Sequence, residues 1–179
     1  MTSNTKTCSM IARAAMYTAL LVMVLLTPLA AKAAVFDDND TSRMTEINEA
    51  IARLQSDVGR SLHDLPRNDA EQIEAYSYVA LNLESAQERL NSIFLLVAVS
   101  MHVDSASDLV QILHLIYAQL LPPGKSFLNE KKDAIASMAA SHPANGDFAA
   151  YNARAAAILG ERAIPLLDEL DRRIAAVFR

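Results

Sequence analysis

Residues 70–103 read AEQIEAYSYVALNLESAQERLNSIFLLVAVSMHV, and this stretch indicates the fold class more clearly than any other. In its first half, from Ile73 to Phe94, apolar residues recur every three or four positions, as on one face of a helix. The stretch contains neither glycine nor proline. We therefore expect one long helix from Ala70 to about Val103, opened by a capping box of Asn68 and Glu71.

The end of this predicted helix differs from its beginning, because residues 93–103 (IFLLVAVSMHV) are apolar on every side. A helix without a polar face is surrounded by protein, by a partner or by lipid. The polar residues 104–107 then predict a turn in which Ser105 caps a second apolar helix, Asp108–Leu121. Residues 93–121 therefore form an apolar helical hairpin.

Further helices are expected on both sides of this hairpin. Proline marks their ends, because it lacks a backbone N–H and crowds the preceding turn, so Pro122-Pro123-Gly124 should end the helix that begins at Asp108. The other helices should run from a cap at Thr41 or Ser42 to Leu65, from Ser126 to Ser141, and from Asp147 to the C-terminus with a kink or restart near Gly160 before Pro165. The sequence thus predicts an all-α, single-domain antiparallel bundle of about five helices.

Residues 1–33 have the order of features found in a secretory signal peptide. Lys6 and Arg13 precede the apolar run 14–29, and small residues then form a cleavage site, Ala31-Lys32-Ala33. The run is shorter than the ~20 residues that span a membrane, so cleavage is favoured over retention as an anchor. We expect export to the periplasm or the medium, a flexible segment over 34–41 after cleavage, and a helical domain over 42–179.

Composition excludes several classes of protein. The one cysteine, Cys8, would leave with the leader, which excludes disulfides, thiolate metal sites and covalently attached haem. Cleavage would remove three of the 16 basic residues and none of the 21 acidic ones, leaving a net charge of −8. Nucleic-acid binding is disfavoured because it requires clustered Lys and Arg.

Motifs for catalysis or cofactor binding are absent from the sequence. No serine lies in a Gly-x-Ser-x-Gly motif, and no glycine-rich phosphate loop is present. None of the four histidines has a second His or a Glu three or four residues away, so we expect no metal and no cofactor. His102 and His114 lie in the hairpin and could meet across its turn, although partial burial with hydrogen bonds is the ordinary interpretation.

The apolar hairpin suggests a function, because a domain of about this size has little room to bury two helices on all sides. We expect a non-catalytic exported protein that binds another envelope protein or a second copy of itself. The alternatives are a carrier or sensor that encloses an apolar small molecule between helices, and a hydrolase using scattered carboxylates. Leu113, Ile116 and Leu120 should point inward, and the candidate interaction or ligand-lining residues are Leu109, Ile112, Leu115, His102, His114 and Tyr117.

Membrane contact is a further alternative for the hairpin. Its apolar arms, 93–103 and 109–121, hold eleven and thirteen residues, too few for either to cross a hydrocarbon core of ~30 Å. Burial within the bundle is therefore favoured over insertion into a membrane surface. The charged run 168–173 pairs Asp168 with Arg172 and Glu169 with Arg173 at four-residue spacing, as on a solvated helix face.

Overall fold

The computed structural model describes residues 35–141 and 146–179, and this described part is helical throughout, with short turns and no strand. Residues Phe36–Arg179 form one compact unit. In chain order its elements are α2 (Asp38–Asp64), α3 (Ala70–His102), α4 (Ala106–Leu115), the π-helical segment η1 (Ile116–Leu120), α5 (Leu121–Ser141), α6 (Gly146–Ala157), the π-helical segment η2 (Ile158–Ala163) and α7 (Ile164–Val177). The predicted signal peptide lies outside the described residues.

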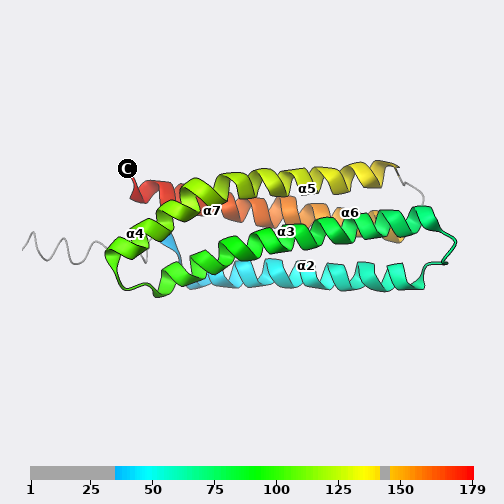
Figure 1. Ribbon diagram of the computed structural model, residues 1–179, viewed down its shortest axis with the longest axis horizontal. Coiled ribbons are helices and arrows are strands. Elements are labelled where there is room, and N and C mark those ends of the chain that lie inside the picture. Colours follow the sequence, from blue (N-terminus) through cyan, green and yellow to red (C-terminus); the bar gives the residue numbers. More distant parts are fainter. Residues whose placement is uncertain (1–34, 142–145) are drawn as a thin grey trace, which may run out of the picture. The chain divides into compact units, whose positions relative to one another are not determined.

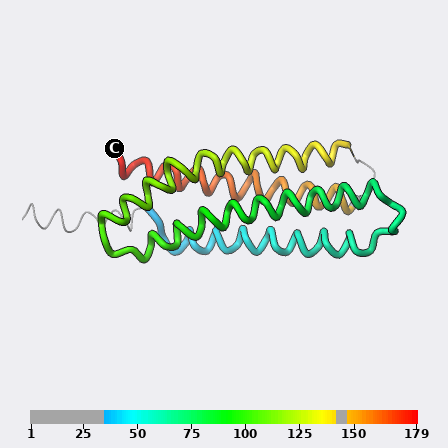
Figure 2. Tube along the Cα trace, in the orientation of Figure 1, coloured from blue at the N-terminus to red at the C-terminus, as the bar shows by residue number. Residues whose placement is uncertain are grey.

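These elements make four long antiparallel rods in the described part, so the expectation of about five helices is wrong (Figure 1). In chain order, the first rod is α2 and the second is α3. The third rod is α4, η1 and α5 in direct succession, and the fourth rod is α6, η2 and α7. The tube in Figure 2 shows that the start of α2, the turn between α3 and α4, and the end of α7 lie at the same end of the bundle. α3 packs between α2 and α5, while α6, η2 and α7 close the ring against α2 and α5.

The first rod begins earlier than the sequence predicts. Asp37, and not Thr41 or Ser42, is the N-cap of α2: its carboxylate accepts a hydrogen bond from the Asp40 amide at 2.9 Å. The carboxylate of Asp40 accepts in return from the Asp37 amide at 3.0 Å, which completes a capping box. Residues 38–41, expected to be flexible, are therefore the first turn of α2.

The bounds of α3 agree with the sequence to within one residue. Its N-cap is Asp69, the neighbour of the predicted Asn68, and the Asp69 carboxylate accepts from the Gln72 amide at 3.2 Å. Ser105 caps α4 as predicted, accepting from the Asp108 amide at 3.4 Å. Local polar side chains thus define where these two helices begin.

The largest correction concerns Pro122 and Pro123, which do not end a helix. Immediately before them, the amide of Leu121 donates to the carbonyl of Ile116, five residues back. The fourth rod repeats the arrangement, since the amide of Ile164, immediately before Pro165, donates to the carbonyl of Leu159. A π turn widens the backbone where the proline ring would crowd a carbonyl, so each rod continues past its proline.

Close packing of α5 on α3 also keeps the third rod continuous. Gly124 is buried, and a Cβ at this position would lie 2.7 Å from Cδ1 of Ile93. The glycine that was expected to help end a helix therefore permits two helices to approach each other. In the fourth rod, the irregularity expected near Gly160 is present as the segment η2.

The core fills the space between the four rods with aliphatic side chains. Leu113 and Ile116 point inward as predicted, and Leu120 is half-buried. At the end near the α2–α3 turn, Tyr76 packs on Phe148 with ring centroids 5.1 Å apart. Fully buried side chains come from every rod and include Ile51, Leu54, Leu83, Leu90, Leu128, Ile135 and Leu159.

Candidate interaction surface

The three leucine and isoleucine candidates on α4 divide between core and surface. Leu109 is a core residue, with 5% of its surface exposed, and is not available to a partner. Ile112 and Leu115 are half-buried. Sequence periodicity could not make this distinction, because α4 is apolar on most of its sides.

The two candidate histidines are both exposed, which differs from the expected burial of this pair. The ring of His114 packs edge-on against Phe178, with centroids 5.9 Å apart. Tyr117 contacts the same ring at 5.9 Å. His114, Tyr117 and Phe178 therefore form an aromatic cluster between the third rod and the end of α7, and His102 lies apart at the last turn of α3.

The aromatic cluster shows which way the flanks of α4 face. His114 and Tyr117 contact Phe178 at the end of α7. In a helix, a residue two positions before another points in roughly the opposite direction. Ile112 precedes His114, and Leu115 precedes Tyr117, by two positions, so both lie on the side of the helix away from Phe178. Since α4 and η1 also pack on α3, these two side chains lie on the side nearest α3.

The most exposed large apolar side chain of the described part lies on α3. Leu95 has 65% of its surface exposed, Val99 is also exposed, and Leu96 is half-buried. We call these three residues of α3 the apolar face. The sequence signal for it was the run 93–103, but the run alone did not show which side chains face solvent.

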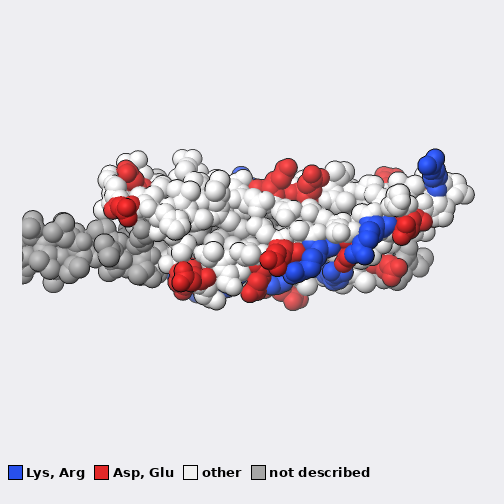
Figure 3. Space-filling view, turned by 90° about the horizontal axis from the view of Figure 1, so that it is seen from below, with Lys and Arg blue, Asp and Glu red and all other residues white. Residues whose placement is uncertain are grey.

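Charged residues are sparse around the apolar face. Between Arg89 and Lys125 the chain has no Lys or Arg, and its acidic residues there are Asp104 and Asp108 at the turn before and at the start of α4. Figure 3 shows the consequence on one side of the bundle: the end that carries α4 is mostly white, with isolated acidic spots. Toward the other end, acidic and basic side chains alternate along the bundle.

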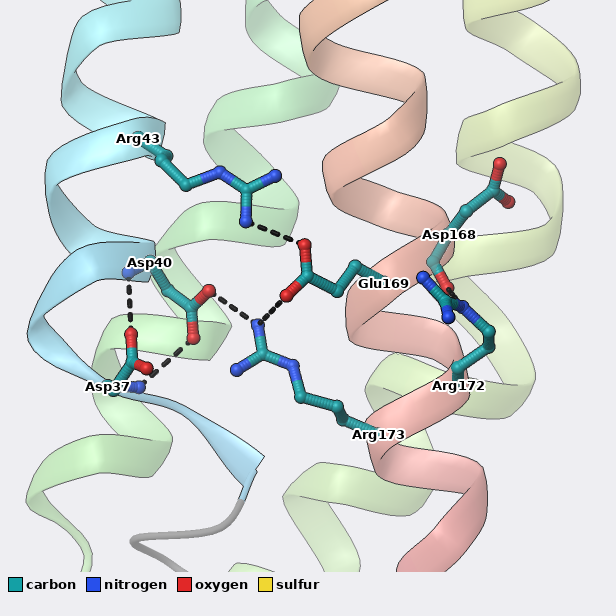
Figure 4. A network of polar contacts seen from close by, with 7 residues as sticks. All are labelled: Asp37, Asp40, Arg43, Asp168, Glu169, Arg172 and Arg173. Atoms are coloured by element: carbon teal, nitrogen blue, oxygen red, sulfur yellow. Dashed lines mark hydrogen bonds and ion pairs between the residues drawn. The ribbon is translucent and has the colours of Figure 1, made fainter.

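This alternation belongs to a seam of ion pairs between α2 and the fourth rod. The seam contains four cross-helix pairs, Asp57–Arg154 at 2.9 Å, Glu46–Arg162 at 3.3 Å, Arg43–Glu169 at 2.7 Å and Asp40–Arg173 at 2.5 Å. Figure 4 shows Arg173 reaching from α7 between the carboxylates of Asp40 and Glu169. Because each arginine of these four pairs faces a carboxylate of another helix, the seam joins α2 to the fourth rod.

Two details of the seam differ from the sequence interpretation of residues 168–173. Glu169 and Arg173 do pair, at 3.7 Å, but Arg172 donates to the backbone carbonyl of Asp168 and not to its carboxylate. The Asp168 carboxylate pairs with Lys125 of α5 at 3.0 Å. Asp40, which sequence reasoning placed in a flexible segment, is 1% exposed and is the innermost acid of the seam.

Interactions in and beside the seam shift the pKa of four ionisable groups, one of which is Asp57, whose pKa is lowered first by its hydrogen bond from Arg154. The hydrogen bond from Arg43 lowers the pKa of Glu169, and burial opposes it only in part. Burial, the largest single effect, lowers the pKa of Arg173, but the hydrogen bond to Asp40 and the nearby charges of Asp40, Glu169 and Asp37 together outweigh it, so the pKa is raised. Burial is likewise the largest single effect on Lys125, but its hydrogen bonds to Asp171 and Asp168 and the charges of these carboxylates together outweigh burial, so its pKa is raised. Each shift favours the charged, paired form.

Two clefts in the described surface are small. One of about 260 Å³ lies between α2 and η2 and is lined by Ala50, Arg53, Ile158 and neighbouring residues, and an adjoining one of about 190 Å³ includes Arg43 and Glu161. Small-molecule sites usually have ~300–1,000 Å³. Within residues 35–141 and 146–179, no group of side chains has the arrangement of a metal site, and no helix is long and apolar enough to span a membrane.

The fold and surface define an antiparallel four-helix bundle with an ion-pair seam on one side and an apolar face at one end. No protein-family model matches the chain, and no curated protein or solved structure matches it either. The function must therefore be argued from the surface itself.

Proposed function

We propose that this protein is a non-catalytic helical bundle, exported to the bacterial cell envelope, that binds another protein through the apolar face. The observation that carries the proposal is the exposure of Leu95 and Val99 in a region without basic residues. Polar residues would suffice at such positions if the bundle had no partner.

The other surfaces offer less support for a function. The arginines of the seam are paired with carboxylates, and the clefts beside η2 are smaller than usual small-molecule sites. The apolar face is instead suited to a partner that supplies apolar side chains, since removing such surface from water stabilises a complex by ~25 cal/mol per Å² before the costs of association.

Leu81 provides a matched control for a test of this proposal. It lies on α3, has 61% of its surface exposed, and belongs to the part of the helix flanked by charged residues. We would place a photo-crosslinking amino acid at position 95 or at position 81 in the full-length chain and irradiate intact cells. The expected result is a discrete adduct to one identified protein from position 95, and none from position 81.

A second substitution links the adduct to the apolar face. Val99→Glu should abolish crosslinking from position 95, because the exposed valine adjoins that position one turn away. Equal adducts from positions 81 and 95, or none from position 95, would contradict the proposal. An adduct with twice the mass of the chain would identify a second copy as the partner and would require the proposal to be revised accordingly.

Export is tested separately by N-terminal sequencing of the protein recovered from the cell envelope. The order of basic residues, apolar run and small residues predicts that the mature chain begins at Ala34. Recovery of an intact leader in the membrane fraction would contradict this part of the proposal, and the crosslinking result would be unaffected by it.

A further inference from the structure

We infer that the segment that binds the apolar face is an apolar helix with Lys or Arg at both of its ends. This inference rests on the function proposed above and specifies the chemistry of the partner. It follows from the distribution of acidic residues around the apolar face.

Acidic side chains lie beyond both ends of the face. On α3, Glu84 and Glu88 are exposed and share a stripe with Leu95 and Val99, because the intervals of four and seven residues return to the same side of a helix. At the other end, Asp104 and Asp108 are exposed around the turn that joins α3 to α4. Between these ends the stripe carries the exposed polar residues Asn91 and Ser92 and then Leu95 and Val99, so its apolar part lies between two acidic ends.

The spacing sets the length of the partner segment. Glu88 and the end of α3 at His102 are fourteen positions apart, which corresponds to roughly 20 Å at 1.5 Å per residue. A helix laid along this stripe would be about four turns long, and its central turns would meet Leu95 and Val99. Basic residues at both ends of such a segment would lie near the acidic ends of the face.

The same charges disfavour two other occupants. A second copy of this chain, related by a twofold axis, would bring its own Glu84 and Glu88 toward Asp104 and Asp108 of the first. Like charges placed together across an interface weaken association. An anionic lipid surface would meet the same acidic residues and be repelled by them.

Two synthetic helical peptides test the inference. They would share one four-turn sequence with apolar central turns and would carry either Lys or Glu at both ends. Their binding to the protein recovered from the envelope would be measured by fluorescence anisotropy. The Lys-ended peptide should bind about tenfold or more tightly than the Glu-ended peptide, as several weak surface charge pairs together would allow. The difference should shrink in high salt, because the acidic residues are exposed.

Variants locate the binding site. The double variant Glu88→Lys/Asp104→Lys should reverse the preference between the two peptides, whereas Glu74→Lys/Asp133→Lys makes the same change in net charge at exposed positions elsewhere and should not. Leu95→Glu should weaken binding of the Lys-ended peptide although it adds a negative charge. Leu81→Glu adds the same charge on the same stripe but beyond Glu84, at the acidic end, and it should not weaken that binding.

Each contrary outcome is distinguishable from failure of the proposed function. Equal binding of the two peptides would overturn the inferred charge pattern while leaving an apolar binding face intact. Binding of the Lys-ended peptide that survives Leu95→Glu would place it elsewhere on this acidic protein and overturn the inference. If neither peptide binds, the inferred partner chemistry is wrong, and crosslinking from position 95 decides independently whether the face binds a protein.

Discussion

The guanidinium of Arg173 and the carboxylate of Asp40 lie 133 positions apart in the chain, yet Nη2 of the arginine is 2.5 Å from Oδ1 of the aspartate. The contact joins the last turns of α7 to the first turn of α2. Since the Asp40 side chain is almost fully enclosed, its charge depends on this partner and on the Asp37 amide, which donates to Oδ2. The pair therefore fastens the two ends of the described chain to each other.

Arg173→Ala should destabilise the bundle by about 3 kcal/mol, because it leaves a buried carboxylate without its cationic partner. Urea denaturation followed by circular dichroism would measure the loss. Arg172→Ala is the control: this neighbouring arginine is exposed, so its removal should change the free energy of unfolding by less than about 0.5 kcal/mol. Equal effects of the two substitutions would contradict the role assigned to the pair.

Acid should weaken the seam through Glu169. Its folded-state pKa is lowered, first by the hydrogen bond from Arg43, so its stabilising contribution is present above the pKa of an unfolded-state glutamate and is lost as the pH falls through the folded-state pKa. Between about pH 5 and pH 3, the urea midpoint of the wild type should therefore fall more than that of Glu169→Gln. Glu74→Gln, at an exposed position on α3, controls for the loss of one charge. Parallel curves for wild type and Glu169→Gln would show that the contact contributes nothing.

Substitution of two helical glycines should change the stability of the bundle in opposite directions. Gly59→Ala should stabilise the bundle by ~0.5–1 kcal/mol, because alanine is the better helix former and a Cβ there meets no atom within 4 Å. Gly124→Val should destabilise it by about 2 kcal/mol, because the added side chain would crowd Ile93 in the contact between α5 and α3. Thermal unfolding measures both changes, and stabilisation by Gly124→Val would disprove the close approach.

Truncation of one leucine on α4 and one on α3 should affect stability very differently, because the first lies in the core and the second on the surface. Leu113→Ala should cost ~2–5 kcal/mol, because it leaves a cavity around a side chain with almost no exposed surface. Leu95→Ala should change stability by less than about 0.5 kcal/mol, since the side chain it truncates is mostly in water. A large loss of stability in Leu95→Ala would mean that the apolar face is part of the core.

The sequence was sufficient for features that depend on neighbouring residues. The bounds of α3 and the cap at Ser105 could be predicted because a polar side chain three residues before an amide determines a helix start. The helical class followed from apolar periodicity. The direction of Leu113 and Ile116 was also correct, since both lie on the inner side of α4 and η1.

Features that depend on distant residues could not be predicted. Pro122 and Pro123 have the local properties of a helix end, but the rod continues because η1 widens the turn before them and Gly124 packs on Ile93 of α3. Leu109 was assigned to the surface because a helix that is apolar on most sides has no periodic signal to separate its faces. Asp40 was missed because its partner, Arg173, is at the other end of the chain.

The two π segments have a consequence for how this chain can vary in length. A hydrogen bond between Leu121 and Ile116, or between Ile164 and Leu159, encloses one residue more than an α turn does. Each segment is thus equivalent to a single inserted residue that is accommodated within one turn. The residues before and after the segment therefore keep the same sides of the helix toward the core. Among homologous chains, one-residue insertions and deletions are expected first at 116–120 and 158–163, where they leave the packing of all four rods unchanged.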